Sequence, residues 1–264
     1  MKTSRLLFLV SLLVSPDLMA GDWCLRVWRD DSRSMSEEAF EATVTPALET
    51  IRTSSVPCVE VVRFGGKGRR IGTEPIETFS WGRLVVPPPE TAKQQPRRSI
   101  AASLGLAGAV VIEEERAQAT RQAEESKHQA RVNQARAEHA RKLTQQMESL
   151  RSSLLRSSPE PAPCTPFRPL NRRIAAEGRP ANVIFTDGWT DCHDADSPGL
   201  KAPGSVVIVL LPRNRDDPSL EDQLFDQRKK ALSMLFPAAK IIAPYELPTI
   251  LAAVLKGTPS AEQE

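Results

Sequence analysis

A strand, a helix and a second strand follow one another in the first part of the chain. Residues 24–29 alternate apolar and polar side chains as a half-buried strand does, and residues 58–64 form another short apolar segment. Between them, residues 37–52 carry apolar side chains at helical spacing. Because two parallel strands need a long crossover, usually a helix, this order predicts a parallel strand pair with a helix packed on it. The sequence therefore favours an α/β fold.

Further segments extend this alternation towards the C-terminus. Residues 205–211 form a continuous apolar run, as expected of a parallel strand buried on both faces. Residues 78–86 are predicted to form a third strand, for which an antiparallel position at an edge of the sheet is one alternative. The other predicted strands are 182–186 and 240–243, and the other helices are 170–176, 220–236 and 247–255. Together these segments predict a mostly parallel sheet of six strands.

One segment does not fit a compact α/β domain. Residues 113–157 contain no proline and no glycine and are rich in Ala, Arg, Glu and Gln, which favour helix. At a rise of about 1.5 Å per residue, such a helix reaches roughly 65–70 Å. Proline-rich segments at 87–96 and 157–169 flank it. We therefore expect a long helix inserted at residues 87–158.

Two roles are open for this long helix. Its repeat of small and polar residues is a weak coiled-coil seam, whereas apolar residues between Leu143 and Leu154 form a stripe along its last third. The stripe is compatible with a solvated helix whose end packs on the domain. It is equally compatible with docking to a partner, or with self-association of two copies through residues 113–157. His128 and His139 are expected to face solvent.

The N-terminus has the features of a secretory signal peptide. Lys2 and Arg5 precede a short apolar run at 6–14, and small residues follow at the expected cleavage point. The run is too short to span a bilayer. We expect a soluble exported protein, secreted or periplasmic, with a bacterial periplasm favoured; an uncleaved membrane anchor is the alternative. The predicted organisation is a signal peptide at 1–20, a domain in two parts at 21–86 and 159–256, the helical insertion at 87–158 and a disordered tail at 257–264.

Charge and cysteine content narrow the class of partner and the redox compartment. The formal net charge is +2, from 35 basic and 33 acidic residues, so no general affinity for nucleic acid or acidic lipid is indicated. An even number of cysteines in an exported chain suggests two disulfides, although four cysteines allow three pairings. The four are Cys24, Cys58, Cys164 and Cys192.

Carboxylates and hydroxyls follow two of the predicted strands. Asp30, Ser32 and Ser34 form a D-x-S-x-S sequence after the first strand, and Asp187 lies in a T-D-G sequence after residues 182–186. Thr165 lies in a loop before a predicted helix. Open α/β sheets bind ligands in the loops beyond the carboxyl ends of their strands. Two carboxylates and three hydroxyls there suit a hard divalent cation such as Mg²⁺, which prefers oxygen ligands.

This three-part pattern resembles the metal-ion-dependent adhesion site of von Willebrand factor A domains. The resemblance implies a doubly wound sheet with strand order 3-2-1-4-5-6 and helices on both faces. It implies that one Mg²⁺ or Mn²⁺ is held by five residues of this chain: Asp30, Ser32, Ser34, Thr165 and Asp187.

The resemblance also implies how the cysteines pair and what the site does. In that fold Cys24 and Cys58 open neighbouring strands, whereas Cys164 and Cys192 lie in loops at the metal end, so Cys24–Cys58 and Cys164–Cys192 are the expected disulfides. The implied activity is metal-dependent protein recognition, in which a partner's carboxylate completes the coordination of the cation. Gly188 and Asp191 would lie at the partner-binding surface, and no small-molecule substrate is expected.

Other interpretations remain open for the same residues. The aspartates could be ordinary turn residues and the serines helix caps. The segment 191–196 contains Cys, His and Asp, but it lacks the ligand spacing of zinc sites. No G-x-S-x-G sequence is present. The sequence favours a binding or scaffold module of the cell envelope and no enzyme; the alternatives are a structural subunit acting through its long helix without metal, or a Mg²⁺-dependent hydrolase.

Overall fold

The computed structural model describes residues 23–32, 34–65, 74–89, 107–156, 165–189, 199–212 and 218–257. The chain divides into two compact units, Met1–Phe79 with Leu150–Glu264, and Ser80–Ser149. The division falls inside the longest helix, α3 (Ala107–Leu155), whose end belongs to the first unit. Whether residues 87–158 fold as an insertion stays a prediction.

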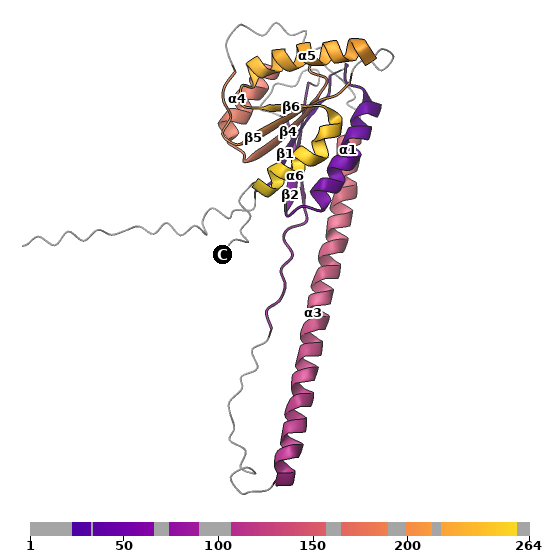
Figure 1. Ribbon diagram of the computed structural model, residues 1–264, viewed down its shortest axis with the longest axis vertical. Coiled ribbons are helices and arrows are strands. Elements are labelled where there is room, and N and C mark those ends of the chain that lie inside the picture. Colours follow the sequence, from indigo (N-terminus) through magenta and orange to yellow (C-terminus); the bar gives the residue numbers. More distant parts are fainter. Residues whose placement is uncertain are drawn as a thin grey trace, which may run out of the picture. The chain divides into compact units, whose positions relative to one another are not determined.

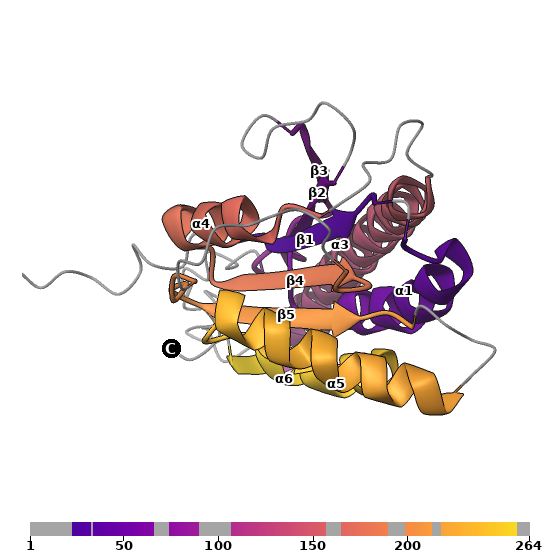
Figure 2. The same ribbon diagram turned by 90° about the horizontal axis from the view of Figure 1, so that it is seen from above.

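The first unit contains a six-stranded mixed sheet with the strand order β3-β2-β1-β4-β5-β6. The strands β1, β4 and β5 run side by side in the same direction (Figure 2). β2 and β6 are also parallel to their neighbours β1 and β5. The order is the one implied by the family resemblance. The strands are β1 (Leu25–Asp30), β2 (Cys58–Phe64), β3 (Ile76–Ser80), β4 (Ala181–Thr186), β5 (Ser205–Leu210) and β6 (Lys240–Ile242).

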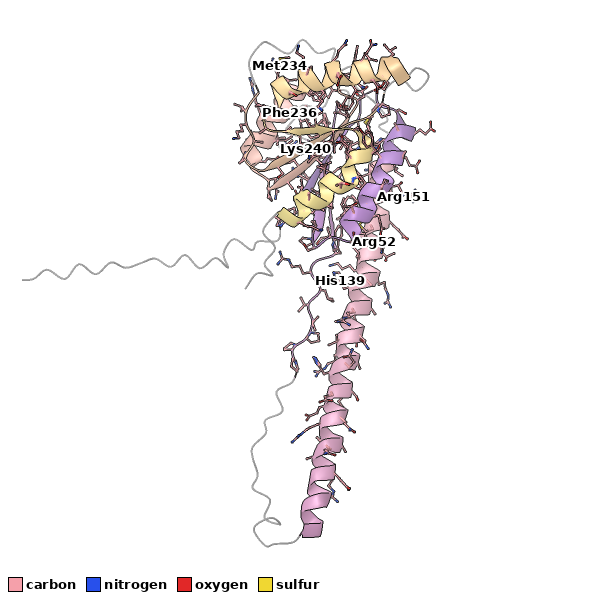
Figure 3. The ribbon with its side chains drawn as sticks, viewed as in Figure 1. Arg52, His139, Arg151, Met234, Phe236 and Lys240 are labelled. Carbon is pink, nitrogen blue, oxygen red and sulfur yellow. A yellow bond between two sulfur atoms is a disulfide. The ribbon has the colours of Figure 1, made fainter. Side chains whose placement is uncertain are left out.

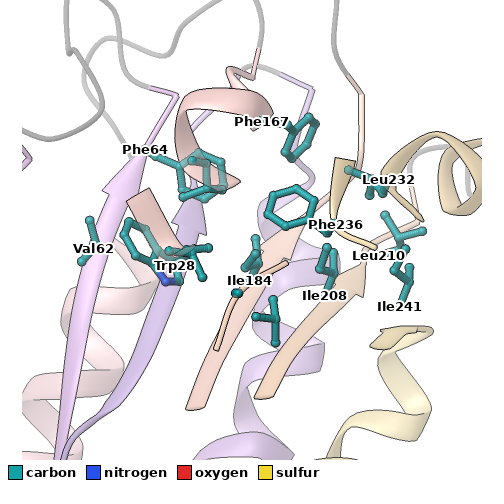
Figure 4. Packing of buried hydrophobic residues seen from close by; sticks show 14 residues of the cluster. Trp28, Val62, Phe64, Phe167, Ile184, Ile208, Leu210, Leu232, Phe236 and Ile241 are labelled. Atoms are coloured by element: carbon teal, nitrogen blue, oxygen red, sulfur yellow. The ribbon is translucent and has the colours of Figure 1, made fainter. Parts of the chain in front are cut away.

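Helices cover both faces of this sheet (Figure 1). On one face α1 and α6 pack against each other, and Phe40 of α1 meets Phe185 of β4 edge to face at 5.3 Å between ring centroids. On the other face, Phe167 of α4 and Phe236 after α5 pack with Trp28 in the main apolar cluster (Figure 4). The helices are α1 (Glu37–Arg52), α4 (Phe167–Glu177), α5 (Pro218–Leu235) and α6 (Leu247–Gly257).

A disulfide joins the starts of two neighbouring strands. Cys24 precedes β1 and Cys58 opens β2, and their sulfurs are bonded. This is the pairing expected for Cys24. The other expected disulfide, Cys164–Cys192, lies outside the described residues.

Two predicted element boundaries are wrong. The strand predicted at 78–86 ends at Ser80, and residues 81–89 have no regular secondary structure. Val85 in this segment is 77% exposed. Three prolines follow at 87–89 and cannot donate the backbone hydrogen bonds that would extend a sheet. The long helix begins at Ala107 instead of residue 113, so it includes the apolar residues before its acidic start.

In the second unit, the segment 81–89 contacts α3. His139 of α3 points towards this segment, and its Nε2–H donates to the carbonyl oxygen of Gly82 at 3.2 Å (Figure 3). His128 and His139 are both only partly exposed, so the prediction that they face solvent holds only in part. Among the helices that the structure describes, none is both long and apolar enough to cross a bilayer.

Candidate metal centre

The predicted ligands lie where three segments meet at the carboxyl edge of the sheet. Asp30 is the last residue of β1, and Asp187 follows β4, which pairs with β1 in parallel. Thr165 precedes α4. Because β1 and β4 mark the point where the strand order reverses, their carboxyl ends form the crevice in which such sheets bind ligands. All three side chains are fully buried.

Three neutral donors hold the carboxylate of Asp30. The hydroxyls of Thr165 and Thr186 donate to its Oδ2 at 2.9 and 2.6 Å. The backbone N–H of Ser32 donates to Oδ1 at 2.9 Å. The hydroxyls of Ser32 and Ser34 lie 3.1 Å apart. These contacts bring together four of the five predicted ligands: Asp30, Ser32, Ser34 and Thr165. They also place Thr186, which was not predicted, beside Asp30.

The carboxylate of Asp187 is only half satisfied. Its Oδ1 accepts the backbone N–H of Trp189 at 3.1 Å. Its Oδ2 is buried and has no hydrogen-bond partner among the described residues. Leaving a charged oxygen buried and unpaired is costly, which makes this atom the clearest sign of a missing partner.

Asp30 and Asp187 are close enough for their charges to repel. Burial, aided by the negative charge of Asp187, raises the pKa of Asp30 from 3.8 to about 6, against the lowering effect of the Thr186, Ser32 and Thr165 hydrogen bonds. Neither carboxylate forms an ion pair within the part of the chain that the structure describes. A cation between them would relieve both the repulsion and the unpaired oxygen.

A glycine keeps room beside the Asp30 carboxylate. Gly65 follows β2 with φ +78°, and a Cβ there would lie 2.8 Å from Asp30 Oδ1 and 3.3 Å from the backbone nitrogen of Ser32. Any other residue would push on the carboxylate and on the loop behind it. The sequence carried a signal for this position, since two glycines directly follow the second predicted strand.

An arginine on α5 fixes the turn that carries Asp187. Arg228 is buried, and its Nη1 donates to the carbonyl oxygens of Asp187 at 2.6 Å and Leu211 at 3.2 Å. Its other terminal nitrogen pairs with Glu221. Sequence reasoning missed Arg228 because nothing local marks an arginine in a helix as a partner of backbone carbonyls.

Gly188 is buried in the same turn, with φ +70°, and its N–H donates to Thr186 Oγ1 at 3.0 Å. A Cβ at Gly188 would lie 2.6 Å from Leu210 Cδ2, so the turn requires glycine. Its contact with a partner stays a prediction. Asp191 and the cysteine- and histidine-containing segment 191–196 lie outside the described residues.

The donor set is unlike a carboxylate-rich or zinc centre. Within the described ranges, no three His, Cys, Asp or Glu side chains gather as metal ligands. A site with two carboxylates and several hydroxyls does not need such a group. It offers only oxygen atoms, and these suit Mg²⁺ or Mn²⁺ better than zinc.

Comparison of the chain with family models, with curated proteins and with solved structures finds no match.

Proposed function

We propose that this chain is an exported von Willebrand factor A-type module that binds one Mg²⁺ or Mn²⁺ and uses it to recognise a protein partner. The ligands would be Asp30, Ser32, Ser34, Thr165 and Asp187. The observation that carries the proposal is the unpaired, buried Oδ2 of Asp187 beside a second buried carboxylate. Such a pair is unfavourable by itself and becomes favourable around a divalent cation.

The residues present fit this cation. The two carboxylates supply the charge, and the hydroxyls of Ser32, Ser34 and Thr165 supply neutral oxygens. Thr165 donates its proton to Asp30, which leaves its oxygen lone pairs available to a metal ion. When bound, the cation would supply an electrophilic centre that prefers a further anionic oxygen.

A binding role follows from how these side chains are arranged. The hydroxyls orient Asp30 through hydrogen bonds, Arg228 fixes the backbone of Asp187, and Gly65 keeps space beside the carboxylate. Each of these residues holds the ligand set in place. We therefore propose metal-dependent recognition of a partner's Asp or Glu side chain, in the cell envelope to which the N-terminal signal would direct the chain.

A second candidate is a structural role for α3 that needs no metal. Residues 115–127 of this helix are exposed on every side, which leaves them available to a partner or to a second copy of the chain. Sedimentation velocity with Mg²⁺ and with a chelator separates the two candidates. Self-association that persists unchanged in the chelator would favour the helix.

Calorimetric titration of Mg²⁺ and Mn²⁺ into residues 21–264 tests the first candidate. We expect about one ion per chain, and loss of binding in Asp187→Asn, which keeps the shape of the side chain but removes its charge. Asp226→Asn is the matched control, because Asp226 is an exposed aspartate on α5. Binding that survives in Asp187→Asn, or no binding to the wild type, would contradict the proposal.

A further inference from the structure

Two buried arginines bind the end of α3. Arg29 of β1 and Arg63 of β2 are paired in the sheet register and are 2% and 7% exposed. Arg63 Nη1 donates to the carbonyl oxygen of Ser153 at 3.2 Å, and Arg29 donates to that of Leu154. Both arginines also donate to the carbonyl oxygen of Arg156. The last carbonyls of a helix lack partners within the helix, so these two side chains cap α3.

The same arginines hold the loop that carries the metal ligands. Arg63 binds Asp31 through two hydrogen bonds, Nε to Oδ2 at 2.8 Å and Nη2 to Oδ1 at 3.0 Å. Arg29 Nε lies 3.6 Å from Asp31 Oδ1. The backbone N–H of Asp31 donates to the carbonyl oxygen of Phe64 at 2.7 Å. Asp31 lies between Asp30 and Ser32, so its position sets the direction in which both neighbours point.

The positive charges of Arg29 and Arg63 are balanced both by the loop that contains Asp31 and by the last turn of α3. Two buried guanidinium groups, those of Arg29 and Arg63, share one buried carboxylate, Asp31. The carbonyls at the end of α3 supply the remaining negative potential. If the helix end left, the two buried arginines would lose their carbonyl acceptors and keep Asp31 as their shared ion-pair partner, and the Arg63–Asp31 geometry would relax.

We infer that Asp31, Arg29 and Arg63 are positioning residues that link the metal loop to the last turn of α3, so that metal binding and the order of this turn strengthen each other. The inference rests on the proposed function. Coupling between sites is reciprocal: if an ordered helix end favours metal binding, metal binding orders the helix end by the same factor. This gives α3 a role in the affinity of the site, beyond that of a spacer.

Hydrogen exchange of the wild-type chain tests the link directly. We expect saturating Mg²⁺ to slow exchange of the backbone amides at residues 150–156 by about fivefold or more, the lower range of site-to-site couplings. The last turn of α1, residues 49–52, lies outside this network and is expected to be unaffected. Calorimetry on the same sample reports whether Mg²⁺ binds.

The outcomes separate the two claims. If Mg²⁺ binds but exchange at 150–156 does not change, the link is wrong and the proposed function stands. If Mg²⁺ does not bind, both are wrong. Slower exchange at 150–156 without a change in the last turn of α1 supports the link.

A substitution provides an independent readout. Arg63→Lys keeps the charge but cannot form the paired hydrogen bonds to Asp31, so we expect Mg²⁺ to bind about tenfold more weakly and to lose its effect on residues 150–156. Arg151→Lys is the control, because Arg151 is exposed and pairs with Glu41. An Arg63→Lys protein that is less stable yet binds Mg²⁺ with unchanged affinity would show that Arg63 is only structural, and would overturn the inference.

Discussion

The two ends of β1 each carry a buried charged side chain, but the two side chains have different kinds of partner. Arg26 and Asp30 lie four residues apart on one strand and therefore on the same face of the sheet. Arg26, near the amino end, pairs with Glu60 at 2.6 Å and Glu177 at 2.8 Å. Asp30, at the carboxyl end, is held by hydroxyls and an N–H, and it has no cationic partner among the described residues.

Under the proposed function, this difference distinguishes a structural end of the sheet from a cation-binding one. At the amino end, Arg173 continues the network by pairing with both Glu74 and Glu177, and the disulfide joins the two strand starts. There the protein supplies the partner of each charge. At the carboxyl end it leaves two carboxylates to be neutralised from outside, which is the condition for a cation site.

The largest expected effect comes from breaking the amino end. Arg26→Met removes the fully buried cation that Glu60 and Glu177 share and leaves them only Arg179 and Arg173 as partners, so it should lower the free energy of unfolding by about 3 kcal/mol. The partial exposure of the two glutamates, 13% and 26% of the side chain, keeps the loss at the lower end of the range for buried pairs. Chemical denaturation measures it. Mg²⁺ affinity is expected to stay the same, and a parallel loss of affinity would mean that the two ends are not separate.

Removing a charge at the carboxyl end of β1 should instead raise the free energy of unfolding of the metal-free protein. Asp30→Asn deletes a fully buried carboxylate whose pKa is about 6 instead of 3.8, so the metal-free variant should be more stable than the wild type at pH 7 by about 3 kcal/mol. Its amide can still bond to Ser32, Thr165 and Thr186. Stabilisation by Mg²⁺ should vanish in this variant. Thermal denaturation with and without Mg²⁺ measures both effects; a variant that is destabilised and still responds to Mg²⁺ would assign Asp30 a structural role.

The same carboxylate predicts a pH dependence of stability in the metal-free protein. Because the pKa of Asp30 is raised to about 6 on folding, the folded state holds its proton over pH 4–6 where the unfolded state has lost it. Its contribution to stability is therefore present below pH 4 and is lost as the pH rises through 6. Urea denaturation of the wild type and Asp30→Asn between pH 4 and 7 isolates this contribution. Parallel curves for the two proteins would contradict it.

A smaller effect is expected at the glycine beside the site. Gly65→Ala places a Cβ 2.8 Å from Asp30 Oδ1, whereas Gly82→Ala, at a similar positive φ, meets no atom within 4 Å. In both variants the left-handed backbone conformation should lower the free energy of unfolding by about 1 kcal/mol. Only Gly65→Ala should also weaken Mg²⁺ binding, which calorimetry would detect. Equal Mg²⁺ affinity in the two variants would mean that the space beside Asp30 is not needed.

The sequence predicted the sheet better than the contacts within the site. Residues 37–52 and 58–64 form α1 and β2 with the predicted bounds, because their apolar residues recur at the spacing of a helix and of a buried strand. The strand predicted at 78–86 was placed too late, because the apolar residues before Pro87 have the composition of a strand but lie in a segment, 81–89, without regular secondary structure.

Contacts between distant residues explain what the sequence did not reveal. Arg63 meets Asp31 and the end of α3 only because β1 and β2 pair in one register, and Arg228 reaches the Asp187 turn from another helix. No local pattern marks such arginines. The Asp30, Thr165 and Asp187 positions were predictable because each follows a strand or precedes a helix at the same edge of the sheet.

The most direct test of the central claim is anomalous diffraction from a crystal of the chain grown with Mn²⁺. The account predicts one anomalous peak among the oxygens of Asp30, Thr165 and Asp187, with Asp187 Oδ2 or a water bound to it in the coordination shell. The same crystal form of Asp187→Asn should lack the peak. A wild-type crystal with no peak at this edge of the sheet, or with Mn²⁺ bound only elsewhere, would contradict the account.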